Sequence, residues 1–195
     1  MVNILGITFG RYILYELYRP VQLCDLVFDS NVQLVTKYHQ FKKNKLGILQ
    51  ESMDRLLQNS TDLFVYFEGD VALGMMWGHR GNCYIRGPGI SLFQDEETIY
   101  WFWIYTAPEA RGKNIYKTLR NTFFSHYNGI NKFTALVEPA NVIMRNEMSK
   151  MGFVETKRYI YVKCRDNSLQ YVKCNKSQKN YIQLDKGNRH NLILI

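Results

Sequence analysis

The sequence predicts an α/β (α+β) fold in which a central mixed β-sheet is flanked by helices. Its 195 residues suit one domain, residues 1–195, because a chain of this length can bury a sizeable core. Between residues 62 and 163, segments rich in β-branched and aromatic residues alternate with amphipathic segments, and hairpin-like segments flank them. Strands that alternate with helices in this way are typical of a mixed sheet with helices on its faces.

The composition is that of a globular protein, with 46% hydrophobic and 22% charged residues. No apolar run reaches the length of a membrane span, and the first residues lack the basic leader and cleavage site of a signal peptide. The cysteines Cys24, Cys83, Cys164 and Cys174 show no metal-ligand spacing. We therefore expect a cytoplasmic protein with reduced cysteines and no bound metal.

The N-terminal part contains three short patterns. Residues 11–28 hold two β-rich pieces around Arg19-Pro20, and residues 31–40 are interpreted as a short helix. Residues 46–57 predict a clearer helix, because apolar side chains recur at steps of three and four. Its stripe consists of Leu46, Leu49, Met53, Leu56 and Leu57.

The centre of the chain predicts three strands. Residues 62–68 and 71–79 form a hairpin around the turn Gly69-Asp70. Residues 99–106 are almost all aromatic or β-branched, which favours a strand buried on both faces. The acidic residues 95–97 are placed at the turn before that strand.

A glycine turn and a helix follow the strand at residues 99–106. Pro108 ends the strand because proline cannot donate to a ladder, and Gly112 permits a tight backbone. The helix then carries an apolar stripe at steps of four, Ile115, Leu119 and Phe123. This geometry aims backbone N–H groups and the positive end of a helix dipole at one point, which favours an anion and most often phosphate.

Two basic side chains flank the glycine of this turn. Arg111 and Lys113 add full positive charges where an anion would lie. The tripeptide alone is equally compatible with an ordinary strand-to-helix connection that carries a solvated basic turn.

The C-terminal half continues the alternation. Residues 132–137 predict a buried strand, and residues 154–164 predict another. A helix between them carries the stripe Ala140, Met144, Met148 and Met151, which we interpret as core packing. The tetrapeptide YVKC at residues 161–164 and 171–174 predicts a hairpin, and residues 191–195 suit an edge strand or a contact in a homodimer.

Two segments resemble motifs of the GNAT superfamily of N-acetyltransferases, and the likeness covers residues 62–163. The sequence PEARGKNIYKTL is similar to the family's acyl-CoA pyrophosphate loop, with Arg111 in its first position and Asn114 and Tyr116 where glycines are expected. Asn114 is the milder departure, because asparagine tolerates a left-handed backbone. The second segment, NVIMRNEMSKMGF, has the family's spacing at Asn141, Lys150, Gly152 and Phe153. Met148 stands where the family often has a tyrosine that protonates the departing thiolate.

The resemblance implies transfer of an acetyl (acyl) group from acetyl-CoA to a primary amine of a small acceptor. The pantetheine arm would pair with the central strand at Ile104, Tyr105 and Thr106, whose N–H groups could also stabilise the oxyanion. The pyrophosphate would lie on the amides of Arg111, Gly112, Lys113, Asn114, Ile115 and Tyr116. Asn141 would hydrogen-bond the arm or an ordered water.

The amine has to lose a proton before it attacks, because a free alkylamine has a pKa of about 10. Glu138 is the first candidate for the base, since it ends the strand beside the central one; the alternative is a solvated turn carboxylate. Tyr105 is a weaker candidate, because a tyrosine in a central strand usually belongs to the core. His79 and His126 are further candidates, because histidine is the residue type that most often exchanges protons near neutral pH, and of these His126 suits a surface or capping position.

Two other functional classes stay open. The residues Asn114, Tyr116 and Met148 are compatible with a GNAT-like domain that binds acyl-CoA without catalysis. The formal net charge of +8 and the 14 tyrosines are compatible with a basic nucleic-acid-binding module, but no recognition motif supports it. The acceptor also stays open among an amino sugar, a small amine, an amino acid and a peptide N-terminus.

Overall fold

The computed structural model describes residues 2–4, 7–18, 29–36, 43–46, 57, 61–85, 90–163 and 170–173. The chain forms two compact units, which we describe separately. The first unit is drawn from Met1–Arg19, Gly81–Thr98 and Lys132–Ile195, and the second from Pro20–Arg80 and Ile99–Asn131. Each unit therefore combines segments that are far apart in the sequence.

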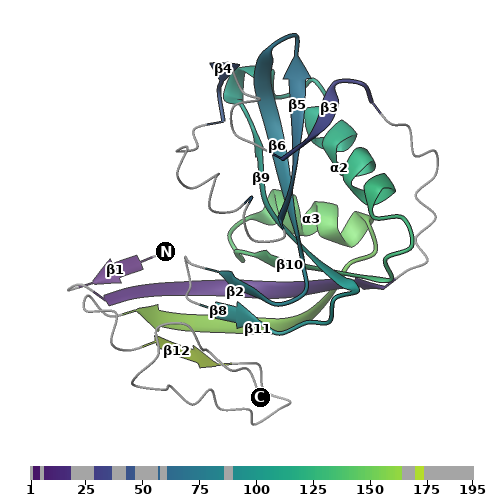
Figure 1. Ribbon diagram of the computed structural model, residues 1–195. Coiled ribbons are helices and arrows are strands. Elements are labelled where there is room, and N and C mark those ends of the chain that lie inside the picture. The colour runs from purple at the N-terminus through teal and green to yellow at the C-terminus, as the bar shows by residue number, and fades with distance from the viewer. Residues whose placement is uncertain are drawn as a thin grey trace. The chain divides into compact units, whose positions relative to one another are not determined.

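The second unit combines a β-sheet with helical segments (Figure 1). Its strands are β3 (Val32–Val35), β4 (Lys43–Asn44), β5 (Thr61–Glu68), β6 (Val71–Arg80) and β9 (Thr98–Thr106). They lie in the order β9-β6-β5-β3 with antiparallel pairing, and β4 pairs with β6 in parallel. The sheet is therefore mixed, and the predicted hairpin and the strand at residues 99–106 are confirmed. The predicted burial on both faces is found in the first part of β9, whereas residues 102–106 are half-buried or exposed.

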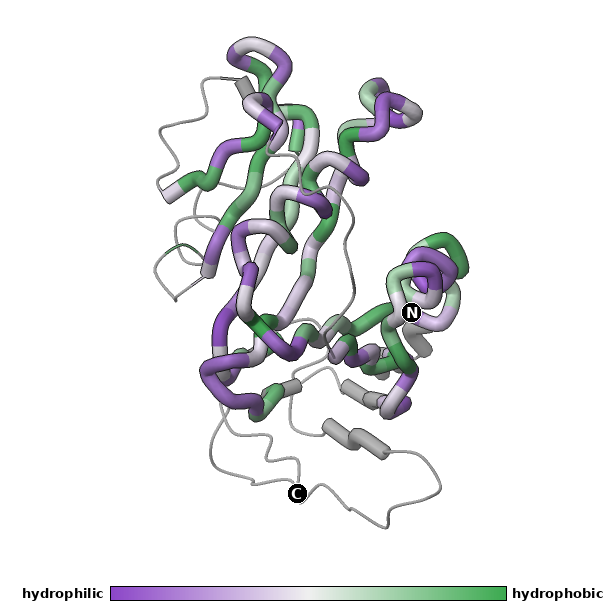
Figure 2. The backbone as a smooth tube through the Cα atoms, turned by 90° about the vertical axis from the view of Figure 1, so that its right-hand side faces the viewer, coloured by the Kyte–Doolittle hydropathy of each residue, from purple (hydrophilic) through white to green (hydrophobic). Residues whose placement is uncertain are grey.

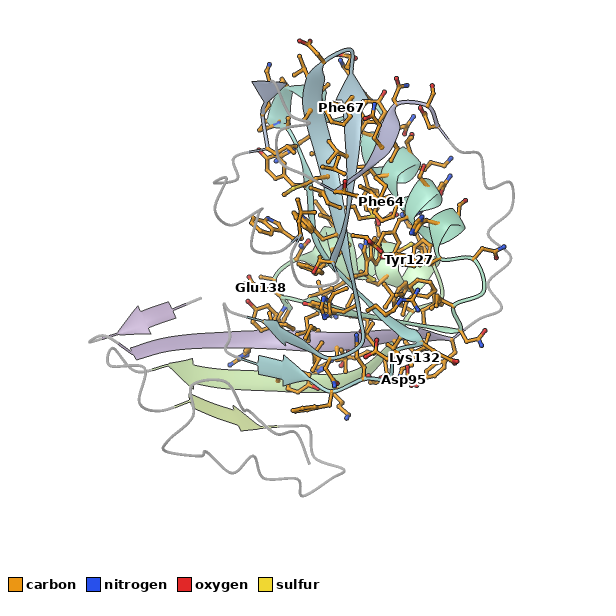
Figure 3. The ribbon with its side chains drawn as sticks, viewed as in Figure 1. Phe64, Phe67, Asp95, Tyr127, Lys132 and Glu138 are labelled. Carbon is orange, nitrogen blue, oxygen red and sulfur yellow. The ribbon has the colours of Figure 1, made fainter. Side chains whose placement is uncertain are left out.

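The helix α2 (Ile115–His126) packs closely on β6, because two glycines of that strand leave room for it. A Cβ atom on Gly74 would lie 2.7 Å from Cγ2 of Ile115, and one on Gly78 would lie 2.7 Å from the hydroxyl of Tyr127. The predicted stripe of Ile115, Leu119 and Phe123 is buried here. Figure 3 labels Phe64 and Tyr127, whose ring centroids are 6.1 Å apart beside this helix.

The other face of the same sheet holds a second hydrophobic cluster. Successive side chains of a strand alternate between faces, so Met75 and Trp77 lie opposite the face that packs on α2. Both are fully buried, together with Val35, Leu46, Leu63, Val65, Phe67 and Ala72. Figure 2 shows hydrophobic residues recurring along these strands. Burial on both faces explains why β5 and β6 are nearly continuous apolar runs in the sequence.

In its described residues, the first unit has an antiparallel sheet, a helix and a small separate β-sheet. Its strands are β1 (Val2–Ile4), β2 (Ile7–Tyr18), β10 (Lys132–Val137), β11 (Val154–Lys163) and β12 (Gln170–Lys173). They lie in the order β12-β11-β2-β10, and β1 pairs with β2. The helix α3 (Val142–Lys150) joins β10 to β11, while β7 (Cys83–Ile85) and β8 (Ile90–Leu92) form a separate two-stranded sheet. The predicted hairpin near the C-terminus is confirmed by the β11–β12 pair.

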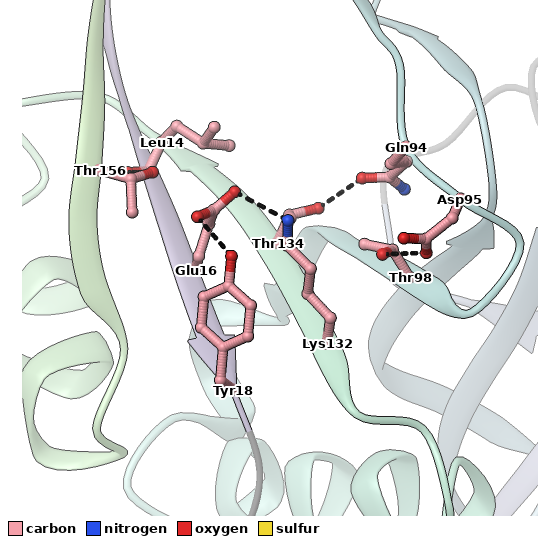
Figure 4. A network of polar contacts seen from close by, with 9 residues as sticks. All are labelled: Leu14, Glu16, Tyr18, Gln94, Asp95, Thr98, Lys132, Thr134 and Thr156. Atoms are coloured by element: carbon pink, nitrogen blue, oxygen red, sulfur yellow. Dashed lines mark hydrogen bonds and ion pairs between the residues drawn. The ribbon is translucent and has the colours of Figure 1, made fainter.

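Polar side chains hold β10 against its neighbours in the first unit (Figure 4). Nζ of Lys132 lies 3.2 Å from Oε1 of Glu16. The other carboxylate oxygen of Glu16, Oε2, accepts a hydrogen bond from the Tyr18 hydroxyl at 3.1 Å. Burial opposes the charge of Lys132, but hydrogen bonds with Tyr18 and Glu16 outweigh it and leave the pKa of Lys132 raised. The Thr134 hydroxyl donates to Oε1 of Gln94 at 2.8 Å. These contacts fix the strand β10, which ends just before Glu138.

Two predictions of local structure are wrong. Residues 32–35 form the strand β3 rather than part of a helix over residues 31–40, because pairing with β5 overrides the local pattern. Ala140 does not belong to the methionine stripe, since it is exposed and precedes α3, which begins at Val142. Met148 and Met151 are buried, as predicted.

Several predicted elements extend beyond the described residues. Of the predicted helix at residues 46–57 the structure describes Leu46 and Leu57, and Leu57 is helical. The second β-rich piece before residue 29, residues 37–40 and residues 191–195 lie outside the described ranges.

Cys83 carries a free thiol, and burial raises its pKa to about 12, so the thiol stays protonated at neutral pH.

Candidate active site

The strand β9 contains a bulge near its C-terminal end. Tyr105 pairs with Met75 and Phe102 pairs with Trp77, so Trp103 and Ile104 face the single residue between those partners. Trp103 has a φ of 43°, a left-handed conformation that is rare for a bulky side chain. A bulge interrupts the ladder and bends the strand, and bulges are frequent next to active sites. The strand segment that was predicted to hold the pantetheine arm thus begins at a bulge.

The connection from β9 to α2 has the conformation that the sequence predicts. The 3-10 helix η2 (Pro108–Ala110) begins at the proline that ends the strand. Gly112 has a φ of 81°, and Asn114 has a φ of 60° in the left-handed region. Asn114 therefore adopts the left-handed backbone that asparagine tolerates better than most residues other than glycine. Apart from its chain neighbours, no atom of the described residues lies within 4 Å of a Cβ atom built on Gly112, so they leave the space above the turn open.

The N-terminus of α2 faces this turn. The amide of Thr118 donates to the carbonyl of Asn114, so the amides before it have no acceptor inside the helix. The Asn114 side chain makes no capping hydrogen bond, and no acidic residue occupies the first turn of α2. The helix dipole and these amides together favour an anion at this end.

The charged side chains of the turn have weak partners in the second unit. Nζ of Lys113 lies 3.2 Å from Oε1 of Glu68, and both side chains are more than half exposed. The Arg111 side chain donates through Nε to the carbonyl of Thr106 at 3.5 Å. An exposed ion pair contributes little free energy, so Lys113 can exchange Glu68 for a bound anion at low cost.

The three residues expected beside the pantetheine arm, Ile104, Tyr105 and Thr106, are all half-buried at the end of β9. The Tyr105 side chain packs against the hydrophobic cluster around Met75 and Trp77. This position favours a structural role for the ring. The backbone of Thr106 still pairs with Gly74, and the amide of Ala107 donates to the carbonyl of Leu73 at 2.8 Å.

Glu138 and Asn141 lie in the first unit, at the turn between β10 and α3. Glu138, labelled in Figure 3, is exposed. Its Oε1 accepts a hydrogen bond from the Tyr12 hydroxyl at 3.4 Å. The Asn141 side chain accepts from the amide of Met144 at 3.1 Å and so caps α3. Its oxygen is thereby used, and its amide NH2 is the group that would reach a ligand.

Arg145 holds the same turn in place. Its Nε donates to the Tyr15 hydroxyl and its Nη1 donates to the carbonyl of Pro139, each at 3.3 Å. Met148 is 1% exposed, so the position that resembles the family's tyrosine carries a core thioether. Tyr12 and Arg145 could not be found from the sequence, since neither lies in a motif and each contact joins distant segments. Trp103 was assigned only to a strand.

The two histidines take structural positions in the second unit. Nδ1 of His79 is 3.1 Å from the Thr61 hydroxyl, and Nε2 of His126 is 3.9 Å from Oδ2 of Asp62. The Tyr127 hydroxyl donates to the same Asp62 oxygen at 2.5 Å. Burial, followed by this hydrogen bond, raises the pKa of Tyr127 well above its usual range. His126 is exposed, as predicted.

No protein-family model matches the chain, and no curated protein matches it. Solved structures do match. A GNAT-family acetyltransferase from Novosphingobium aromaticivorans gives a TM-score of 0.56 at 10% identity, over 83% of this chain and 68% of that one. An acetyltransferase of the GNAT family from Colwellia psychrerythraea gives 0.52 at 16% identity, over 80% of this chain and 56% of that one.

A third match supports the same fold. A GCN5-related N-acetyltransferase from Sphaerobacter thermophilus gives a TM-score of 0.53 at 14% identity, over 82% of this chain. The fold is that of the GNAT acetyltransferases. The predicted GNAT-like α/β architecture is thus confirmed. The chain spans only 56% and 53% of the Colwellia and Sphaerobacter proteins, and at these identities the GNAT likeness concerns the fold.

Two further observations concern the described part of this GNAT-like chain. No group of three or more His, Cys, Asp or Glu side chains in it could hold a metal ion. None of its helices is long and apolar enough to cross a membrane.

Proposed function

We propose that the protein is a GNAT-type N-acyltransferase that transfers an acetyl group from acetyl-CoA to a primary amine. The observation that carries this proposal is the turn between β9 and α2. Two left-handed residues, Gly112 and Asn114, direct the chain into an uncapped helix N-terminus with an open space above it. On a GNAT fold, this is the position in which the pyrophosphate of acetyl-CoA would lie.

The residues present fit a pyrophosphate. The amides from Arg111 to Tyr116 supply donors, and the side chains of Arg111 and Lys113 supply positive charge. The first turn of α2 carries no acidic residue that would repel the phosphates. Asn114, one of the two departures from the family's glycines, adopts the left-handed backbone that a glycine would supply. Tyr116 is half-buried rather than open to the ligand.

The pantetheine arm would run from this turn back along β9 at Ile104, Tyr105 and Thr106. The bulge leaves backbone groups of β9 without a regular partner on β6, and such groups can pair with the amides of the arm. Backbone N–H groups aimed at the thioester oxygen would stabilise the negative charge that develops there. Asn141 would contribute its side-chain NH2 group to the arm or to a water.

The reaction requires one proton to leave the amine and one thiolate to leave the thioester. The amine nitrogen attacks the carbonyl carbon, Glu138 accepts the proton directly or through a water, and the C–S bond breaks. Tyr12 donates a hydrogen bond to Glu138 and would orient the carboxylate. Met148 has no proton to give, so the thiolate would leave as the anion or take a proton from water.

A second candidate function is acyl-CoA binding without catalysis. The observation that favours it is the burial of Met148, which replaces the usual proton donor by a side chain that belongs to the core. Thiol release in the presence of a panel of primary amines, measured alongside acetyl-CoA binding by calorimetry, separates the two. Binding without release above the rate of hydrolysis would support the second function. The small-amine partner, the homodimer and the cytoplasmic location stay predictions.

A further inference from the structure

The side chain of Trp103 lies on the face of the sheet opposite to the one that regular strand alternation predicts for it. Trp101, two residues earlier, contacts the Phe124 ring of α2 with a centroid distance of 5.5 Å, so regular alternation would direct Trp103 toward α2 as well. Instead its ring stacks on Trp77, at 6.3 Å and an interplanar angle of 20°. Trp77 belongs to the cluster on the opposite face. The bulge and the left-handed backbone of Trp103 therefore redirect this indole.

The redirected ring completes a row of neighbouring aromatic side chains, in which Tyr100 stacks on Phe102 and Trp77 on Trp103, while Phe102 and Trp77 are tilted. Tyr100 and Phe102 lie parallel at 5.1 Å with an interplanar angle of 5°, and Phe102 lies 6.2 Å from Trp77 at 30°. Trp103 is the outer member of this row and is 44% exposed, whereas Trp77 is fully buried. One face of the Trp103 indole is thus held by a fixed ring while much of its surface stays open. A strained backbone that exposes a large apolar ring needs a functional explanation.

The position of Trp103 relative to the proposed arm supplies that explanation. If the pyrophosphate lies at the turn after β9, the arm runs backward along Thr106, Tyr105 and Ile104, and its reactive end reaches the residue before them. That residue is Trp103. Its exposed ring therefore lies where an acceptor amine must approach the thioester.

We propose that Trp103 determines acceptor specificity, and that its exposed indole receives a planar aromatic group of the acceptor amine. This inference rests on the proposed acetyl transfer. Near-parallel rings in the row offer a further flat ring the same offset stacking, which is favourable between aromatic groups. A cation over the indole is a poorer choice, because the formal net charge of +8 disfavours a highly cationic acceptor.

The test compares two amines of equal charge that differ in ring planarity, 2-phenylethylamine and 2-cyclohexylethylamine. The parent protein should show a kcat/KM about tenfold higher for 2-phenylethylamine, the size expected for one stacked pair with its buried area. Trp103→Gly, which suits the left-handed backbone, should abolish this preference through KM, and Trp103→Phe should restore most of it. Phe93→Ala removes another exposed aromatic ring, 53% exposed in the first unit, and should leave the preference unchanged.

Acetyl-CoA binding by each variant separates this inference from the proposed function. Equal thermal shifts with acetyl-CoA in the parent and Trp103→Gly, together with an unchanged amine preference, would overturn the role of Trp103 and leave acetyl transfer standing. If acetyl-CoA binds but no amine is turned over, the test uses the NMR resonance of the Trp103 indole N–H, which is assigned by its loss in Trp103→Phe. This resonance is followed during titration with 2-phenylethylamine and with 2-cyclohexylethylamine. A shift for the aromatic amine alone supports the proposal. A shift with acetyl-CoA alone would assign the ring to the acyl group instead, and no thermal shift by acetyl-CoA would overturn acetyl transfer itself.

Discussion

At the scale of single residues, Gly112 tests the pyrophosphate site most directly. Gly112→Asp places a side chain and a negative charge in the open space above the turn, where the phosphates are proposed to lie. We expect the Kd of CoA to rise roughly 10- to 100-fold, measured by isothermal titration calorimetry. Lys113→Ala should have a smaller effect, about threefold, because the backbone amides remain and exposed charge pairs contribute little.

Gly129→Asp is the matched control for Gly112→Asp. Gly129 also has a positive φ, 97°, and among the described residues only its chain neighbours could lie within 4 Å of a built Cβ, but it follows the C-terminal end of α2. Both variants should lose similar stability through backbone strain. If Gly112→Asp folds and binds CoA as tightly as Gly129→Asp does, the turn is not the pyrophosphate site.

Glu138 is the proposed general base, and a single substitution tests this role. Glu138→Gln keeps the shape of the side chain but cannot accept the proton, so kcat should fall about 100- to 10,000-fold while the Kd of acetyl-CoA stays unchanged. Glu147→Gln changes another carboxylate of the first unit, which pairs with Lys150, and serves as the control. Full turnover by Glu138→Gln between pH 6 and 9 would remove Glu138 from the mechanism.

At the scale of elements, the left-handed residue before α2 predicts an unusual ranking of substitutions. Asn114→Gly should be neutral or slightly stabilising, because glycine adopts a φ of 60° without a Cβ clash. Asn114→Ala should lower the free energy of unfolding by about 1 kcal/mol for the same reason. Urea unfolding followed by circular dichroism measures both. If Asn114→Ala were more stable to urea than Asn114→Gly, the left-handed backbone at this position would be contradicted.

The contact of α2 with β6 carries another prediction. Gly74→Ala would press its Cβ against the stiff, β-branched Ile115 and should cost about 1–3 kcal/mol. Ile115→Leu removes the Cγ2 atom, so the double variant should recover part of this loss. A double-mutant cycle in urea measures the coupling. Additive losses would show that the helix and the strand are not in close contact here.

The elements also show what the sequence could predict. The turn after β9 was predictable because Pro108 ends a strand locally and Gly112 permits the left-handed backbone of the turn. The strand β3 was not, since its conformation depends on pairing with β5. The bulge at Trp103 likewise depends on register with β6, and no local pattern marks it. The contact between Tyr12 and Glu138 joins residues far apart in the chain, so spacing could not reveal it.

At the scale of the whole molecule, ligand binding should stabilise the fold. A ligand that binds only the folded state contributes about 2.7 kcal/mol at a hundredfold excess over its Kd. CoA and acetyl-CoA should therefore raise the melting temperature in differential scanning fluorimetry, whereas adenosine without phosphates should raise it much less. No shift at millimolar CoA would contradict both acetyl transfer and acyl-CoA binding.

The interleaving of the two units has a consequence for how the protein is made. The long strand β2 pairs with β10 on one edge and with β11 on the other, and both partners are synthesised only after the whole second unit. During translation β2 therefore emerges without either partner, and its open edges are available to other chains. We expect this non-local pairing to be the slow step of refolding, and the nascent chain to depend most on chaperones before β11 has left the ribosome.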